Sequence, residues 1–340
     1  MALSLLNSPT SKLAPKPPLP PPSRQFAPPQ QQQKQSPLHL SLLLREQPRH
    51  VRSSSSPPVD ASPSPPSSRE EAVSQARSCL ATALRKPLNN SVPPRKLKKQ
   101  RQPRFRAEIP VVDDSPGSLA RLASDVFSSG LGVSRKGGGA PARLLLVWPS
   151  SEELGVALQG PYDWGTSTAH AQLDAVAPDA LSSCDAAVFL APGRSQVEKM
   201  RAAADALDPK PVVLFNPAWS FDEEEGFAVS ESGFVCSFNV VYSFTGLEVR
   251  GLLSKKRGVL LRCVEGGRFG GESWVLMVED DAAPEVDQFK VVSRLKRRPT
   301  IGEVETMLYN LMAANSPVTK SARFLRQLVS NVTGGKNEKQ

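Results

Sequence analysis

The clearest hydrophobic pattern in the chain lies in its middle, between residues 186 and 219. Ala186–Leu190 and Pro211–Phe215 are apolar throughout, as expected of parallel strands that are covered on both faces. Ser195 and Glu198 have the spacing of a reciprocal N-cap, and Asp208-Pro209 predicts the end of the helix that follows. The apolar positions of that helix predict one buried stripe, formed by Val197, Met200, Ala204 and Leu207. This region therefore predicts a strand–helix–strand unit of a parallel sheet.

Helical patterns also occur on both sides of this unit. A helix is expected over residues 70–84, and Pro87 is expected to prevent it from continuing. A second helix is expected to begin at Ser115-Pro116 and to end at Gly130. Thr300 and Glu303 form a capping box for a third helix, and a last helix is expected from Ser316. The inward face predicted for the first helix is Val73, Ala76, Leu80 and Leu84. The inward face predicted for the third is Ile301, Val304, Leu308, Leu311 and Met312.

Further strand-like runs complete the expected sheet. Residues 104–110 alternate as a short edge strand does, and residues 144–148 are apolar. The polar, glycine-containing region 151–177 predicts only helical turns. The later strand candidates are residues 234–244, 259–264, 273–278 and 289–295, of which the second and third pair as a hairpin. The pattern predicts an α/β fold: an open, mostly parallel sheet flanked by helices, with an added antiparallel C-terminal strand group and two terminal helices.

The first 69 residues differ in composition from the rest. Sixteen of the 33 prolines precede Arg69, together with a glutamine run and clustered serines, and only two acidic residues. This composition is typical of a chloroplast transit peptide, and the alternative is an ordinary disordered proline-rich tail. We therefore expect a transit peptide and disordered segment over 1–69 and one α/β domain over 70–332. That domain is expected to contain a basic disordered insertion at about 87–103, and residues 333–340 are expected to form a disordered tail.

The formal net charge of +9 is unevenly placed. Residues 1–106 carry 18 Lys or Arg and 4 Asp or Glu, whereas residues 107–340 carry 24 and 29. The expected folded body is thus mildly acidic, which argues against a nucleic-acid partner because such domains carry their basic face on the fold. The basic run before it predicts a cationic surface, whose members are Lys96, Lys98, Lys99 and Arg101. That surface fits an anionic lipid or an acidic partner, and a solvated flexible insertion is the alternative.

The residues that commonly carry catalysis or metals are sparse. Cys79, Cys184, Cys236 and Cys263 form no Cys-x-x-Cys pair and are interpreted as buried, inert thiols. His170 is the one histidine after residue 69, and no ligand or nucleophile motif surrounds it. The chain lacks a phosphate-binding loop of the Gly-x-x-x-x-Gly-Lys-Ser/Thr type, and no run reaches the length of a membrane span. We expect no catalytic residue, no cofactor and no metal.

One candidate site follows from topology. Ligands of open parallel sheets bind where the carboxyl ends of the strands converge. The residues expected at those ends are Ser150, Gly193, Arg194, Ser195, Asn216 and Trp219. A helix N-terminus at 193–195 can hold an anion, and an asparagine can fix a polar group. The alternative is that these residues only turn the chain.

Short motifs in one order resemble a known family. They are Val147-Trp148-Pro149, Asp163-Trp164-Gly165, the strand ends at Pro192-Gly193 and Asn216-Pro217, and Arg298-Pro299 before Glu303. This order resembles a domain family of plants, algae and cyanobacteria that has no assigned function. The family includes the chloroplast low-photosystem-II-accumulation assembly factors. The resemblance implies a chloroplast protein that assists photosystem biogenesis, and it supplies no catalytic residues. Some relatives carry an acid where this chain has Ser150.

Two functions of different classes remain open. The first is an assembly factor that binds photosystem subunits or their insertion machinery at the stromal face of the thylakoid. The second is a nucleotide- or metabolite-binding α/β enzyme that uses the strand-end cleft. The missing phosphate loop and the single histidine favour the first. In either case we expect the protein in the chloroplast stroma, free or held peripherally on the thylakoid membrane.

Overall fold

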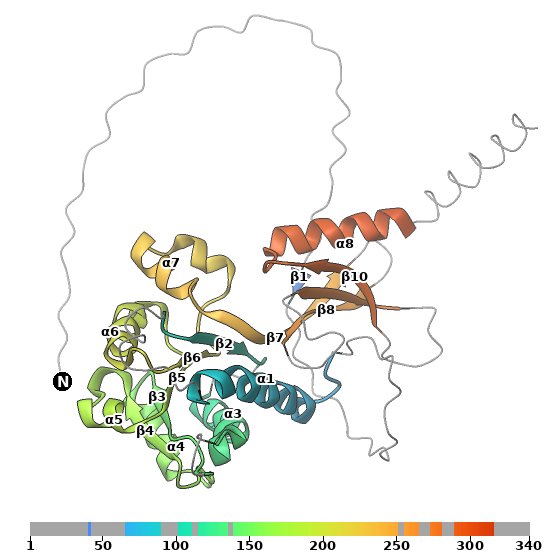
Figure 1. Ribbon diagram of the computed structural model, residues 1–340. Coiled ribbons are helices and arrows are strands. Elements are labelled where there is room, and N and C mark those ends of the chain that lie inside the picture. The colour runs from blue at the N-terminus through green and yellow to red at the C-terminus, as the bar shows by residue number, and fades with distance from the viewer. Residues whose placement is uncertain are drawn as a thin grey trace, which may run out of the picture. The chain divides into compact units, whose positions relative to one another are not determined.

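The computed structural model describes residues 40–41, 65–89, 101–110, 115–134, 139–250, 255–264, 273–280 and 289–315. The chain divides into the units 1–37 and 38–340, and all described residues lie in the second. One mixed sheet runs through them (Figure 1). Its strands are β1 (Leu40–Ser41), β2 (Arg104–Glu108), β3 (Leu144–Trp148), β4 (Thr168–Gln172), β5 (Ala186–Leu190), β6 (Val212–Phe215), β7 (Asn239–Arg250), β8 (Lys255–Cys263), β9 (Trp274–Glu279) and β10 (Phe289–Leu295).

The strand order is β10-β9-β8-β7-β2-β6-β5-β3-β4, and β1 pairs with β7. Strands β2, β6, β5, β3 and β4 are parallel to their neighbours, and β7 continues the parallel pairing with β2. Strands β8, β9 and β10 then add in antiparallel fashion. The predicted class, an open and mostly parallel α/β sheet with an antiparallel C-terminal group, is confirmed.

The buried strands divide their side chains between two layers, as a strand covered on both faces must. In β3, Leu144, Leu146 and Trp148 pack on one face, where they join side chains of α1 (Arg69–Asn89), α3 (Pro116–Phe127) and α4 (Ser151–Gln159). Leu145 and Val147 pack on the other face, with α6 (Val197–Leu207) and α7 (Val229–Val235). The predicted stripe of α6 is confirmed, because all four of its residues are buried.

A third cluster holds the antiparallel part together. Val304 and Leu308 of α8 (Ile301–Asn315) pack against Leu260 of β8 and Leu276 of β9. Figure 1 shows α8 lying along this end of the sheet, close to β10 and β8. Ile301 was expected to face inward, but it is 44% exposed, because it precedes the first buried turn of the helix. The other expected helix, from Ser316, lies outside the described residues.

Several boundaries differ from the sequence-based expectation. Helix α1 passes through Pro87 and ends at Asn89, because only the last turn loses a hydrogen bond there and the Asn89 side chain donates to the Arg85 carbonyl (2.9 Å). Helix α3 ends at Phe127, and a 3₁₀ turn, η1 (Ser128–Gly132), follows before the chain turns. Of the expected insertion at about 87–103, residues 87–89 belong to α1, and Gln102 is buried with its amide donating to the Ala204 carbonyl (2.7 Å). Residues 90–100 lie outside the described residues.

Two strands were misjudged from the sequence. β2 was expected at an edge, but it lies in the middle of the sheet, between β6 and β7. Its polar alternation arises because Arg106 and Glu108 pair with each other inside the protein, not because one face meets water. β4 falls in the region where only helical turns were expected, and it is an edge strand without an apolar run. The run predicted from residue 234 begins as a strand only at Asn239, because α7 occupies 229–235.

Candidate functional site

The carboxyl ends of β3 and β5 form the topological switch point of the parallel part. From β3 the chain continues to β4 on one side, and from β5 it continues to β6 on the other. The side chain of Gln196 occupies the space between these strand ends. Its Oε1 accepts from the Gly193 backbone N–H (2.8 Å), and its Nε2 donates to the Pro149 carbonyl (2.7 Å). Gln196 therefore bridges the two loops where a ligand was expected.

The N-cap that was predicted at Ser195, before α6, lies two residues earlier in the chain, at Gly193. A 3₁₀ turn, η3 (Arg194–Gln196), precedes α6, and the reciprocal contact joins Gly193 to Gln196 instead of Ser195 to Glu198. Glu198 pairs instead with Arg201 (3.2 Å) and Ser195 is exposed. On the neighbouring strand end, the hydroxyl of Ser150 accepts from the Glu153 N–H (3.3 Å) and begins α4. Both strand ends thus use their polar residues to start helices.

Arg194 and Trp219 hold the acidic turn η4 (Asp222–Gly226). The guanidinium of Arg194 donates to the Gly226 carbonyl and lies 4.8 Å from the centre of the Phe227 ring. The indole N–H of Trp219 donates to Glu224 Oε1 (3.0 Å), and Trp219 is buried. Both side chains are therefore engaged by η4.

Asn216 ties the end of β6 to the segment after β2. Its Oδ1 accepts from the Ile109 N–H (2.7 Å), and its Nδ2 donates to the Ile109 carbonyl (2.8 Å). Its φ is +46°, a left-handed conformation that asparagine adopts more readily than most residues. The amide acts as a clamp between two neighbouring strand ends. Of the predicted cationic surface, Arg101 is exposed, whereas Lys96, Lys98 and Lys99 lie outside the described residues.

A buried ionic network lies next to this clamp, and sequence reasoning missed it. Arg106 of β2 pairs with Glu224 of η4, and its Nε lies 2.5 Å from Glu108 Oε1. Arg298 reaches the same oxygen of Glu108 (2.9 Å), and Ser243 of β7 donates to the other oxygen (2.8 Å). Arg106 is only 3% exposed and Glu224 only 6%. Two positive and two negative side chains therefore compensate one another at the centre of the sheet.

The network controls the charge state of its members. Burial alone raises the pKa of Glu108, but Arg106 and Arg298 outweigh it and lower that pKa to about 2. Burial alone lowers the pKa of Arg106, and the carboxylates of Glu108 and Glu224 reverse the shift, so the pKa is raised. Glu108 and Arg106 therefore both stay charged at neutral pH, and neither is held in the intermediate protonation state that a general acid or base needs.

His170 lies within an aromatic cluster on β3 and β4. Trp148 Nε1 can only donate, so the hydrogen bond to His170 Nδ1 (3.1 Å) places the histidine proton on Nε2. The ring of Trp164 meets His170 edge-on, with centroids 4.7 Å apart. Burial lowers the pKa of His170 to about 4, so the ring is neutral at physiological pH. These contacts are those of a structural histidine.

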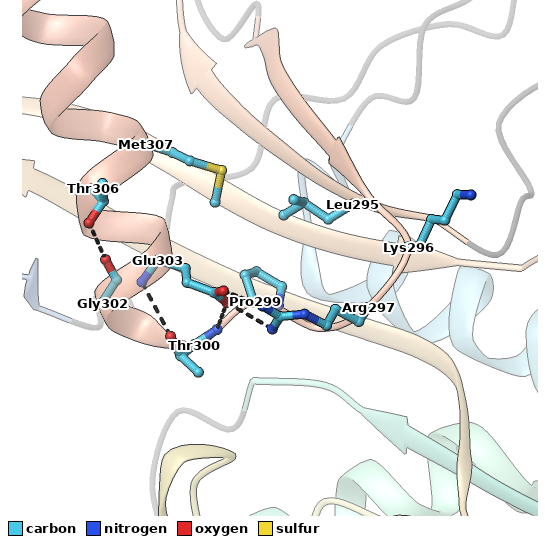
Figure 2. Close-up of a pocket in the computed structure, with 9 residues that line it drawn as sticks. All are labelled: Leu295, Lys296, Arg297, Pro299, Thr300, Gly302, Glu303, Thr306 and Met307. Atoms are coloured by element: carbon cyan, nitrogen blue, oxygen red, sulfur yellow. Dashed lines mark hydrogen bonds and ion pairs between the residues drawn. The ribbon is translucent and has the colours of Figure 1, made fainter.

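An open groove lies instead in the antiparallel part, between the end of β10 and the first turns of α8. It is a hollow of about 860 Å³. Its lining residues are Leu295, Lys296, Arg297, Pro299, Thr300, Gly302, Glu303, Thr306 and Met307. Figure 2 shows Met307 and Leu295 pointing toward one another across it, whereas Lys296 extends away from the helix.

Polar contacts fix the wall of this groove. Glu303 accepts from the Thr300 N–H (2.9 Å), and Thr300 Oγ1 accepts from the Glu303 N–H (3.2 Å), which confirms the predicted capping box. Arg297 Nη1 donates to the same Glu303 (2.9 Å). The next residue, Arg298, turns inward to the ionic network and lies 5.0 Å from the centre of the Trp274 ring. Two consecutive arginines therefore connect the groove to the middle of the sheet: Arg297 contacts the groove residue Glu303, and Arg298 contacts Glu108 of β2.

Within the described ranges, no cluster of three or more His, Cys, Asp or Glu side chains is placed to hold a metal ion. No helix among those residues combines the length and apolar character needed to cross a bilayer.

The fold and these sites define an open α/β protein whose strand-end polar side chains bind groups of the chain itself. Its sequence matches the family described as a domain of unknown function (DUF1995) over residues 66–306, and the chain belongs to that family. No curated protein matches the chain.

Proposed function

We propose that this protein acts by binding other proteins, as a chloroplast factor that assists photosystem assembly at the stromal face of the thylakoid. The observation that carries this proposal is the groove between β10 and α8. The resemblance of the chain's motifs to the low-photosystem-II-accumulation factors supports the choice of photosystem subunits, or their insertion machinery, as partners.

The chemistry of the groove suits a peptide segment with an apolar side chain beside an acidic one. Leu295 and Met307 offer apolar contact, and burying one large apolar side chain there contributes about 1.5–3 kcal/mol. Lys296 provides a cation at the edge, while the charge of Arg297 is already compensated by Glu303. Methionine adapts its shape to different partners, which suits a surface that receives protein segments.

The strand-end cleft supports binding less well than the groove does. Internal hydrogen bonds already engage the polar side chains there, namely those of Gln196, Arg194, Asn216 and Trp219. A substrate using these groups has to replace each of those bonds, which costs about 1–3 kcal/mol per buried group left unpaired. This is why we place the partner at the groove and propose a binding protein over an enzyme.

The proposal is tested by filling the groove without disturbing the fold. Gly302 lines the groove, and a Cβ added there meets no atom within 4 Å, so Gly302→Tyr is expected to fold normally. Gly233 on α7 is an exposed helical glycine with equally open space, so Gly233→Tyr is the matched control. Both variants replace a helical glycine, which favours the helix.

The readout is the recovery of photosystem subunits with tagged full-length protein from solubilised thylakoids, together with photosystem accumulation in a complemented knockout. We expect Gly302→Tyr to lose both, and Gly233→Tyr to retain both. If neither variant changes them, the groove is not the binding surface. If no photosystem subunit is recovered with the unaltered protein, the proposed function is wrong.

The proposed location is tested separately by washing thylakoids. If the cationic surface holds the protein on the membrane, moderate salt releases it, since the effect of each basic residue fades within about 10 Å at 0.1 M salt. Neutralising Lys96, Lys98, Lys99 and Arg101 is then expected to move the protein to the stroma. Protein that resists both salt and alkaline washes contradicts a peripheral association.

A further inference from the structure

Two cysteines that are 184 residues apart in sequence lie in contact. Cys79 is on α1 and Cys263 is the last residue of β8, and their Sγ atoms are 3.4 Å apart. Both are thiols in this structure. The sequence indicated inert cysteines because it contains no Cys-x-x-Cys motif, and the contact arises only because α1 packs across β7 and β8.

Packing on both sides fixes the pair. Cys79 is fully buried between Ala76 and Leu80 on the inward face of α1. Cys263 pairs in antiparallel register with Tyr242 of β7, and the Tyr242 hydroxyl lies 3.3 Å from Gln75 Oε1 of α1. Cys263 itself is only half-buried, so a reagent is expected to reach it more readily than Cys79.

We propose that Cys79 and Cys263 form a dithiol site that closes to an intramolecular disulfide. A disulfide bond is about 2.05 Å long, so the two sulfurs need to approach by little more than 1 Å, within reach of small side-chain rotations. The other described cysteines contact oxygen atoms instead: Cys184 donates to the Leu181 carbonyl, and Cys236 lies 3.8 Å from Ser232 Oγ.

The reaction is a thiol–disulfide exchange, and its oxidant is a small disulfide or an oxidised dithiol protein. The Cys263 thiol loses its proton and attacks one sulfur of the oxidant, whose second sulfur leaves as a thiolate and takes up a proton. Cys79, losing its proton, then attacks Cys263 Sγ and displaces the remaining thiolate. Two protein thiols are oxidised by two electrons, and one disulfide of the oxidant is reduced to two thiols.

Closure ties α1 covalently to the antiparallel part of the sheet. Such a link, enclosing a long stretch of chain, restricts the unfolded state and raises the melting temperature of the folded one. The site is separate from the groove, because neither cysteine is among the residues that line the groove.

The test uses the full chain, equilibrated in buffers of graded reduced-to-oxidised glutathione ratio, quenched with acid and alkylated. Peptide mass mapping is expected to find Cys79 joined to Cys263 in monomeric protein, two hydrogens lighter than the dithiol. The melting temperature is expected to rise by several degrees and to fall again on reduction. Cys263→Ser is expected to abolish both changes.

Because Cys79 is fully buried, the decisive control leaves the pair untouched. The double variant Cys184→Ser/Cys236→Ser is expected to form the same disulfide at the same glutathione ratio as the unaltered chain. If both remaining thiols of this variant are alkylated at every ratio, or if they are linked only between two chains, the proposed site is wrong.

Discussion

The parallel and antiparallel parts of the sheet differ in what lies at the ends of their strands: internal hydrogen bonds in the first, and an open groove in the second. At the carboxyl ends of the parallel strands, Gln196, Asn216 and Arg194 bind neighbouring backbone groups. At the antiparallel end, the connection from β10 to α8 leaves a groove of about 860 Å³. Topology indicates where the strand ends of a parallel sheet converge, but the side chains at those ends decide whether a ligand has room.

The largest effect is expected in the ionic network, whose residues come from both the parallel and the antiparallel part of the protein. Arg106→Met leaves the carboxylates of Glu108 and Glu224 without their shared cation, and we expect it to lower the free energy of unfolding by about 3–5 kcal/mol in a urea titration. Lys199→Met is the control, since its pair with Asp174 is exposed and is worth at most about 1 kcal/mol. Equal losses in the two variants would show that the network does not hold the parts together.

The clamp at Asn216 tests whether the strand-end cleft is structural. Asn216→Ala removes two hydrogen bonds to Ile109 and is expected to cost about 1–3 kcal/mol in unfolding free energy. Asn216→Gly loses the same bonds but accepts the positive φ, so it is expected to be the more stable of the two. A fully stable Asn216→Ala protein that fails to complement a knockout would instead assign the residue to a binding site.

We expect the stability of the fold to depend on pH through His170, which lies in the parallel part of the sheet. The pKa of His170 is lowered from 6.5 to about 4, so the unfolded chain binds more protons between these values. His170 therefore stabilises the fold above pH 6.5, and this contribution is lost as the pH falls toward 4. We expect a loss of the order of 1 kcal/mol, discounted because the ring is partly exposed. The non-titrating His170→Gln variant should show a flatter profile of unfolding free energy over this range; an unchanged slope contradicts the assignment.

The smallest expected effect concerns the wall of the groove. Thr300→Ala removes the cap of α8 and is expected to cost about 0.5–1 kcal/mol, with faster amide hydrogen exchange in the first turn of the helix. Thr306→Ala is the matched control in the same helix, because its hydroxyl only donates back to the Gly302 carbonyl. Faster exchange in both variants alike would mean that the cap does not set the shape of the groove.

Elements with a strong local pattern were predicted from the sequence. The apolar runs of β3, β5 and β6, the buried stripe of α6 and the capping box at Thr300 depend on neighbouring residues, and the structure confirms them. β4 was missed because an edge strand does not need an apolar run. A local signal does exist for half of the ionic network, since Arg106 and Glu108 are two positions apart and share one face of a strand.

The remaining features depend on contacts between distant segments. Glu224 and Arg298 are 118 and 190 residues away from their partners on β2, so the sequence gives no spacing by which to find them. The same holds for the contact between Cys79 and Cys263 and for the hydrogen bond from Gln196 to Pro149. The groove depends on where α8 packs against β10, which the amphipathic pattern of α8 does not specify.

The central position of β2 sets the order in which the protein can fold during synthesis. β2 leaves the ribosome before every other parallel strand of the sheet, yet both of its neighbours, β6 and β7, begin more than a hundred residues later. Pairings of such long range form slowly, because the intervening chain must first be brought together. Until η4 emerges, Arg106 lacks Glu224, one of the two carboxylates that compensate its charge in the folded protein. In a nascent chain, the centre of the sheet therefore stays incomplete until β6 and β7 have been synthesised, although β2 is the first of its parallel strands to emerge.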